Sequence, residues 1–177
     1  MIMLLSAFIS CKKEALKSEV ILKEEIVKPH VQPEGKPTNI DSATVISLHN
    51  KVLKDFYTST NYRTVWQSEE KRKIILGQLL KSDEEGLIPE DYNVKTLFDF
   101  EKKAASLDSV DLAKYDILLT SSLQKYISHL TNGRLNPRKL YKNWDLKPNE
   151  IDLNTTVAQL LQTDSLVYKI EQLKPNH

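Results

Sequence analysis

Apolar residues recur at helical spacing along most of the chain after residue 40. The longest pattern predicts a helix over residues 109–131, because its apolar positions lie three and four residues apart on one face. These positions are Leu112, Tyr115, Leu119, Leu123, Tyr126 or Ile127, and Leu130. Gly133 follows the pattern, and we expect it to stop the helix in the left-handed conformation that glycine adopts at little cost.

Two shorter helices are predicted before this one. The first begins with Asp41 or Ser42 as its N-cap. Its expected apolar face consists of Val45, Leu48, Val52 and Phe56. The second follows Ser68, has Glu69 and Glu70 in its first turn, where they suit the helix dipole, and closes at Gly86. Its expected core residues are Ile75, Leu76, Leu79 and Leu80.

The segments around the second helix break the pattern. Residues 57–66 have no helix formers in phase, so we expect a loop or a short extended piece whose Tyr62 and Trp66 enter the core. After Gly86, Pro89 is predicted to begin a short helical piece, because proline suits the first turn of a helix. A third helix is expected over about residues 93–105, with Val94, Leu97 and either Phe98 or Phe100 buried.

Two last helices are predicted over about residues 154–161 and 164–173, with Asn154 and Asp164 as their N-caps. Residues 41–177 therefore predict a mainly α fold, a single helical bundle. Only 4 glycines in 177 residues argue against a turn-rich β sandwich, and 40% hydrophobic residues suffice for one core.

The first eleven residues, MIMLLSAFISC, form an apolar run that is too short to span a bilayer. The run is typical of a signal peptide, and residues 8–11 resemble a bacterial lipobox, in which Cys11 would be lipidated. No cationic residue precedes the run, and Phe8 stands where leucine is commoner. A plain secretory signal and an N-terminal strand are the alternatives. Residues 12–40, with Pro29, Pro33 and Pro37, are typical of a flexible tether. We therefore expect a periplasmic cell-envelope protein, held to a membrane by a lipid anchor.

Charge and motifs exclude several functions. The formal net charge of +1 comes from 25 basic and 24 acidic residues, so no field attracts nucleic acid, and no nucleic-acid partner is expected. The sequence has no phosphate-binding loop, dinucleotide fingerprint, zinc-protease motif or serine-hydrolase elbow. Its histidines are far apart in sequence, so we expect neither a metal nor a cofactor.

One acidic group could act as an enzyme's acid and base pair. Glu84, Glu85, Glu90 and Asp91 lie around Gly86. Such a pair needs one carboxyl group that is desolvated enough to keep its proton. These residues instead fit solvated helix ends, which is the interpretation that we favour.

The stretch LTNGRLNPRKLYKNW, residues 130–144, is the other candidate for a site. Its aromatic and cationic side chains could stack on sugar rings and pair with carboxylates or phosphates, with contact residues Arg134, Arg138, Tyr141 and Trp144. The alternative is structural: Tyr141 and Trp144 anchor the loop in the core, and Arg134 binds carbonyl groups at the end of the long helix.

Three segments, in this order, resemble the scaffold domain of the large multidomain L,D-transpeptidases. They are FYTSTNYRTVWQ (residues 56–67), EEGLIPEDYNVKTL (residues 84–97) and KYISHLTNGRLNPRKLYKNW (residues 125–144). The resemblance covers residues 41–177. It implies an exported protein that works with peptidoglycan outside the cytoplasmic membrane.

In that family the catalytic cysteine lies in a separate downstream domain, within a Ser-x-Gly-Cys-(Val/Ile)-Arg motif, which this sequence lacks. The resemblance therefore implies a non-catalytic scaffold, truncated at its C-terminus, and no catalytic residue. Its expected partners are peptidoglycan or a catalytic or peptidoglycan-binding domain, with an apolar docking patch near the last two helices. The alternative is a stand-alone envelope module that binds peptidoglycan or a protein.

Overall fold

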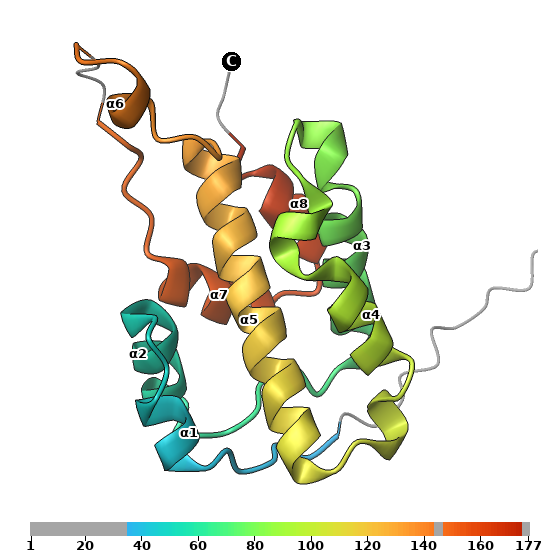
Figure 1. Ribbon diagram of the computed structural model, residues 1–177. Helices are drawn as coiled ribbons and strands as arrows, with labels where there is room; N and C mark the ends of the chain where they lie inside the picture. The colour runs from blue at the N-terminus through green and yellow to red at the C-terminus, as the bar shows by residue number, and fades with distance from the viewer. Residues whose placement is uncertain (1–34, 144–146, 175–177) are drawn as a thin grey trace, which may run out of the picture. The chain divides into compact units, whose positions relative to one another are not determined.

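The computed structural model describes residues 35–143 and 147–174, and in these residues the fold is mainly α, as predicted (Figure 1). The α-helices are α1 (Ser42–Ile46), α2 (Lys51–Ser59), α3 (Glu69–Leu80), α4 (Val94–Glu101), α5 (Ser109–Asn132), α6 (Pro137–Leu140), α7 (Leu153–Gln162) and α8 (Leu166–Glu171). Three short 3-10 helices connect them: η1 (Ser82–Glu85), η2 (Pro89–Tyr92) and η3 (Ala104–Ser106). The only pairing of extended backbone in the described residues is a single antiparallel bridge between Asn39 and Arg63.

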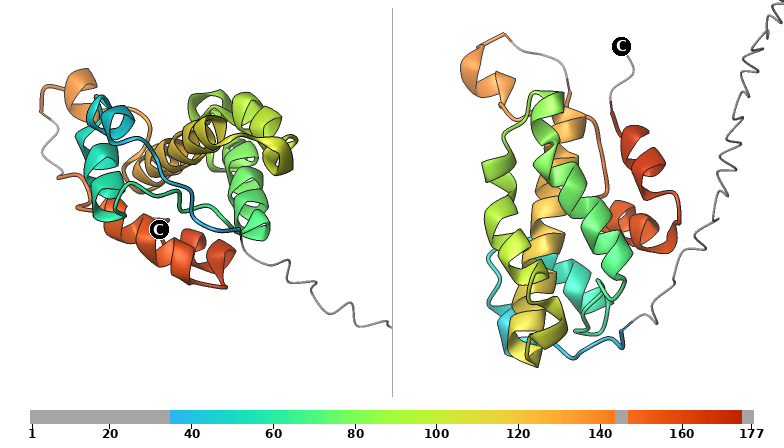
Figure 2. Two further views of the ribbon diagram at one scale, coloured as in Figure 1. Left: turned by 90° about the horizontal axis from the view of Figure 1, so that it is seen from below. Right: turned by 90° about the vertical axis from the view of Figure 1, so that its right-hand side faces the viewer.

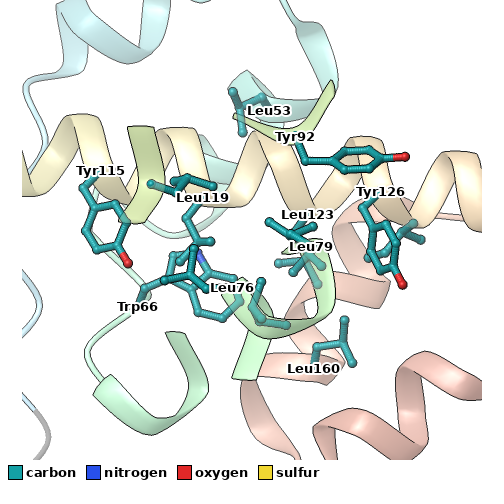
Figure 3. Close-up of a cluster of buried hydrophobic side chains, with 14 of the residues drawn as sticks. Leu53, Trp66, Leu76, Leu79, Tyr92, Tyr115, Leu119, Leu123, Tyr126 and Leu160 are labelled. Atoms are coloured by element: carbon teal, nitrogen blue, oxygen red, sulfur yellow. The ribbon is translucent and has the colours of Figure 1, made fainter. Parts of the chain in front are cut away.

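Helix α5 is the centre of the bundle. Its 24 residues are long enough to contact α2 and α7 on one side and α3, α4 and η2 on the other (Figures 1 and 2). The predicted apolar face of α5 is confirmed by five of its buried side chains: Tyr115, Leu119, Leu123, Ile127 and Leu130. Figure 3 shows Trp66 and Leu76 beside Leu119 of α5, and Tyr92 of η2 near Tyr126, which lies farther along α5.

Polar side chains begin the main helices. Asp41 and Ser68 accept hydrogen bonds from backbone N–H groups of α1 and α3, so these two predicted N-caps are confirmed. Asp108 does the same for α5. The predicted caps of the last two helices are wrong, because Asp152 caps α7 in place of Asn154, and α8 begins after Ser165, not Asp164.

The first predicted helix is two helices. Asn50 caps a new helix by accepting a hydrogen bond from the Leu53 N–H, so the chain changes direction after α1. As a consequence Leu53 is buried and Val52 is 38% exposed, which corrects the predicted apolar face. Helix α2 also extends to Ser59, so only residues 60–67 are irregular. Within that stretch Trp66 is buried and Tyr62 packs against the core, as predicted.

Two glycines end helical segments in different ways. Helix α3 ends at Leu80, earlier than predicted, and η1 carries the chain to Gly86, which is left-handed with φ 70° and ψ 17°. Gly133 follows α5 with φ 78° and ψ 159°. The predicted left-handed conformation of Gly133 is therefore wrong, since only its φ has the expected sign. Its backbone lies in a region that is essentially restricted to glycine.

The Gly133→Ala variant should lose about 1–3 kcal/mol of unfolding free energy, through backbone strain alone. No atom lies within 4 Å of a Cβ built at this position, so no clash contributes. Gly77, inside α3, is a matched control with equally open space and ordinary backbone angles. Gly77→Ala should raise stability by about 1 kcal/mol, because alanine favours helix. Urea unfolding measures both, and equal shifts of the same sign would contradict this account.

Candidate functional site

The three segments that resemble the transpeptidase scaffold all contact α5. The first of them meets α5 at Asp116, which is 3% exposed. One carboxylate oxygen of Asp116 accepts hydrogen bonds from the backbone N–H groups of Val65 at 2.9 Å and Trp66 at 2.8 Å. The other accepts from the Tyr57 hydroxyl at 2.6 Å. Asp116 thus fixes the irregular turn and α2 to the middle of α5.

Thr120, one helical turn after Asp116, completes this group. Its hydroxyl accepts a hydrogen bond from Trp66 Nε1 at 2.9 Å, lies 2.8 Å from the Tyr57 hydroxyl, and donates to the Asp116 carbonyl at 2.9 Å. A buried Tyr or Trp needs a partner for its polar atom, and Thr120 and Asp116 supply both partners. We call Tyr57, Trp66, Asp116 and Thr120 the α5 network.

Burial governs the protonation of Asp116. Desolvation raises the pKa of its carboxyl group to about 6, against the opposing effect of the hydrogen bonds from Tyr57, Trp66 and Val65, which favour the charged form. Three donors bind the two carboxylate oxygens, so a structural role explains why Asp116 is buried.

A second buried cluster lies beside the α5 network. Arg72 on α3 binds Glu101 on α4 through two hydrogen bonds, of 2.8 and 3.2 Å, and both side chains are about nine-tenths buried. Arg72 Nη1 also donates to the carbonyl oxygens of Trp66 and Gln67, each at 3.0 Å. The Tyr115 hydroxyl donates to Glu101. Arg72 therefore joins α3, α4 and the turn that carries Trp66.

The two buried clusters border a cavity of about 450 Å³, whose lining includes Trp66, Arg72, Glu101, Tyr115 and Asp116. Every charged group among these five is already bonded to protein partners, as described above. The cavity therefore has no free buried charge that would select a ligand. In the described part of the chain, no group of three or more His, Cys, Asp or Glu residues could hold a metal ion.

The second and third segments meet near the end of α5. Arg134 Nε donates to Asp91 of η2 at 2.6 Å, and Lys125 donates to the Asp91 carbonyl at 2.9 Å. The Tyr92 hydroxyl lies 3.0 Å from His129 Nδ1. Burial raises the pKa of Tyr92 to about 12 and lowers the pKa of His129, so both side chains favour their neutral forms. This contact closes η2 onto α5.

The predicted contact residues Arg134, Arg138, Tyr141 and Trp144 have different positions. Arg134 binds Asp91, not the carbonyl groups at the end of α5, which corrects the structural alternative for this residue. Tyr141 is 62% exposed, so it does not anchor the loop in the core. Trp144, the side chain of Arg138 and the predicted lipidation site Cys11 lie outside the described residues.

The acidic group around Gly86 is divided among separate ion pairs. Glu85 pairs with Lys174, Asp91 pairs with Arg134, and Glu84 lies 3.9 Å from Lys81. The hydrogen bond from Arg134 lowers the pKa of Asp91, whereas an acid catalyst must keep its proton. The arrangement therefore gives no support to an enzyme's acid and base pair.

Exposed apolar side chains do lie on the last helix. Leu166 and Ile170 of α8 are buried, while Val167 is 45% and Tyr168 62% exposed. Leu80 of α3, a helix that packs against α8, is 49% exposed. An apolar patch was predicted near this helix, and the docking of another domain there stays a prediction. In the described residues no helix is both long and apolar enough to cross a membrane.

Sequence comparison places the chain in a family. A family model described as "Scaffold domain" matches residues 51–177, from the first residue of α2 onward, so the chain belongs to the Scaffold domain family. No curated protein and no solved structure matches the chain.

The α5 network was not predicted as a unit. The long helix and the burial of Trp66 were predicted, but Tyr57, Asp116 and Thr120 were not singled out. Asp116 and Thr120 stand one turn apart next to the apolar positions Tyr115 and Leu119, where a polar residue is unexpected. A polar pair on the core face of a helix is the signal that could have identified them.

Proposed function

We propose that the chain is the non-catalytic scaffold of an L,D-transpeptidase-type protein of the cell envelope, and that it holds a catalytic or peptidoglycan-binding domain in place for cross-linking. The family match supports the scaffold part of this proposal. The resemblance of three ordered segments supports the transpeptidase part, and Cys11 with its apolar run supports a periplasmic lipoprotein anchored to a membrane.

One observation carries the proposal: the distinctive residues of the three segments form contacts that hold the fold together. Tyr57 and Trp66 bind Asp116 and Thr120, Tyr92 contacts His129, and Arg134 binds Asp91. A domain whose characteristic polar residues are used in this way suits a platform better than a reactive site. Its activity would then reside in another domain.

The alternative is a stand-alone module that binds peptidoglycan through Arg134, Arg138, Tyr141 and Trp144. The exposed ring of Tyr141 favours it. The ion pair between Arg134 and Asp91 weighs against it, because one of the four contact residues is already engaged.

Retention on purified sacculi distinguishes the two. The scaffold proposal expects no more retention than for a Tyr141→Ala/Trp144→Ala variant whose fold is intact by circular dichroism. Strong retention that the variant loses would instead establish the stand-alone module. Muropeptide analysis after prolonged incubation is the companion measurement, in which the scaffold proposal expects no change and any new cross-link would contradict it.

A further inference from the structure

Residues 134–143 form an arm that stands off from the bundle. We call this segment the α6 arm. It leaves α5 after Gly133 and contains only the short helix α6, which has no extensive packing with any other helix in the described residues. Figure 1 and the right view of Figure 2 show α6, in orange, apart from the helices that surround α5. The arm therefore contributes little to the core, and its composition needs another explanation.

The apolar side chains of the α6 arm face solvent. Leu135 is 63% exposed, Leu140 59% and Tyr141 62%. A single exposed leucine is ordinary on a protein surface. Three large apolar side chains within seven consecutive residues, on a segment that covers no core, are a local concentration that indicates an interaction surface.

The same arm is cationic. Residues 134–143 contain Arg134, Arg138, Lys139 and Lys142 and no acidic residue, although the whole chain has a net charge of only +1. Lys139 and Lys142 are exposed and have no carboxylate partner among the described residues. Many lysines elsewhere on the bundle do have one, for example Lys51, Lys73 and Lys114. Positive charge is therefore left unneutralised on this arm.

We propose that the α6 arm docks on an anionic lipid surface. Leu135, Leu140 and Tyr141 enter the headgroup region of the bilayer, and Lys139 and Lys142 lie at the anionic headgroups. Aliphatic side chains beside lysines and an aromatic ring are the combination that binds at the interface of an anionic membrane.

A sugar polymer is a poorer partner for the same surface. Leucine side chains neither stack on sugar rings nor form hydrogen bonds with hydroxyl groups, and two of the three exposed apolar side chains, Leu135 and Leu140, are leucines. Membrane docking goes beyond the proposed scaffold function and does not depend on the link to transpeptidases. Unlike the predicted lipid anchor, it requires no acylation.

Vesicle binding by the full chain tests the proposal, with Cys11→Ala in every variant so that no acyl chain takes part. Vesicles of phosphatidylcholine with phosphatidylglycerol should bind the protein more tightly than vesicles of phosphatidylcholine alone, and added salt should weaken the binding. Lys139→Gln/Lys142→Gln should weaken binding about 30-fold, from the usual contribution of a lysine near an anionic surface. Lys95→Gln/Lys103→Gln, which removes two exposed lysines on and after α4, should leave binding unchanged.

The apolar part of the arm has its own test. Leu140→Ser should weaken binding to the anionic vesicles about tenfold, because less apolar surface leaves water. Ile46→Ser is the matched control, since Ile46 on α1 is 61% exposed, and it should have no effect. Unchanged unfolding midpoints would show that the variants are folded.

Three results would overturn the proposal. The first is equal binding to the two kinds of vesicle, and the second is an equal loss for the arm and the control lysine pairs. The third is retention on sacculi that depends on Lys139 and Lys142 while vesicle binding does not, which would assign the arm to peptidoglycan. A failure of the scaffold proposal is a separate result, because it would be seen in muropeptides or in sacculus retention that depends on Tyr141 and Trp144.

Discussion

Asp116→Ala should lower the free energy of unfolding by about 3–5 kcal/mol, the cost of leaving buried partners of a charged group without their acceptor. The backbone N–H groups of Val65 and Trp66 and the hydroxyl of Tyr57 would all lose their bonds to the carboxylate. Urea unfolding measures the change. Asp55→Ala is the control, because Asp55 is half exposed and its partner, Lys51, lies at the surface. The Asp55→Ala variant should lose about 0.5 kcal/mol of unfolding free energy or less.

Asp116→Asn should be much milder than Asp116→Ala. The amide oxygen can still accept from both backbone N–H groups, while the amide nitrogen donates to the Tyr57 hydroxyl, which can turn its own proton toward Thr120. The variant also removes a desolvated charge. An asparagine variant as unstable as the alanine variant would show that the negative charge itself holds the network.

The pH dependence of stability, compared between Asp116→Asn and the wild type, gives a second measurement. The folded pKa of Asp116, about 6, lies above its value of about 3.9 in an unfolded chain. Between these values the native state binds more protons than the unfolded state. The contribution of Asp116 to the free energy of unfolding is therefore fully present below pH 3.9 and is lost as the pH rises through 6. The difference in stability between Asp116→Asn and the wild type should therefore shift in favour of asparagine from about pH 4 to about pH 7. A constant difference would contradict the raised pKa.

Arg72→Ala should also cost about 3–5 kcal/mol, because it leaves Glu101 as a buried charge without its partner. The carbonyl oxygens of Trp66 and Gln67 would lose a donor at the same time. Arg72→Lys should recover only part of the loss, since a lysine cannot form the paired hydrogen bonds that the guanidinium group makes with Glu101. Thermal and urea unfolding measure the series.

Lys73→Ala provides the control for the Arg72 series. Lys73 follows Arg72 on α3, and its ion pair with Glu69 is largely exposed. An exposed ion pair of this kind contributes little to stability, so the variant should remain close to the wild type. If Lys73→Ala and Arg72→Ala were equally destabilised, burial of the Arg72 and Glu101 pair would not explain the loss of stability in Arg72→Ala.

The sequence predicts the long helix and its core face because a 24-residue helix repeats its apolar signal over several turns. The N-cap Ser68 was predicted equally well, since a serine followed by two acidic residues is a local signal of a helix start. Local signals fail where two choices are nearly equivalent. Asp152 and Asn154 are both suitable caps two residues apart, and the apolar spacing of Val45, Leu48 and Val52 continues across the break that Asn50 makes between α1 and α2.

The candidate site was harder to predict from the sequence than the fold, because its contacts join distant parts of the chain. Asp116 binds residues 50, 51 and 59 positions away, and Arg134 binds Asp91 across 43 positions. No periodic pattern encodes such pairs. The sequence indicates that Trp66 and Arg134 are unusual residues, but not which partners bind them. Gly133 shows the same limit, since its identity revealed a positive φ and left ψ open.

The bridge at Asn39 has a mechanical consequence. A pulling force on the chain before Gly35 would first load the pair of hydrogen bonds that joins Thr38 to Thr64, then the bond from the Ile40 N–H to the Tyr62 carbonyl. Residues 62–64 continue directly into the turn that Asp116 holds. Tension would thus pass through that turn into the middle of α5, the most extensively packed helix, before it could peel α1 away. The bundle would therefore receive such a load at its central helix.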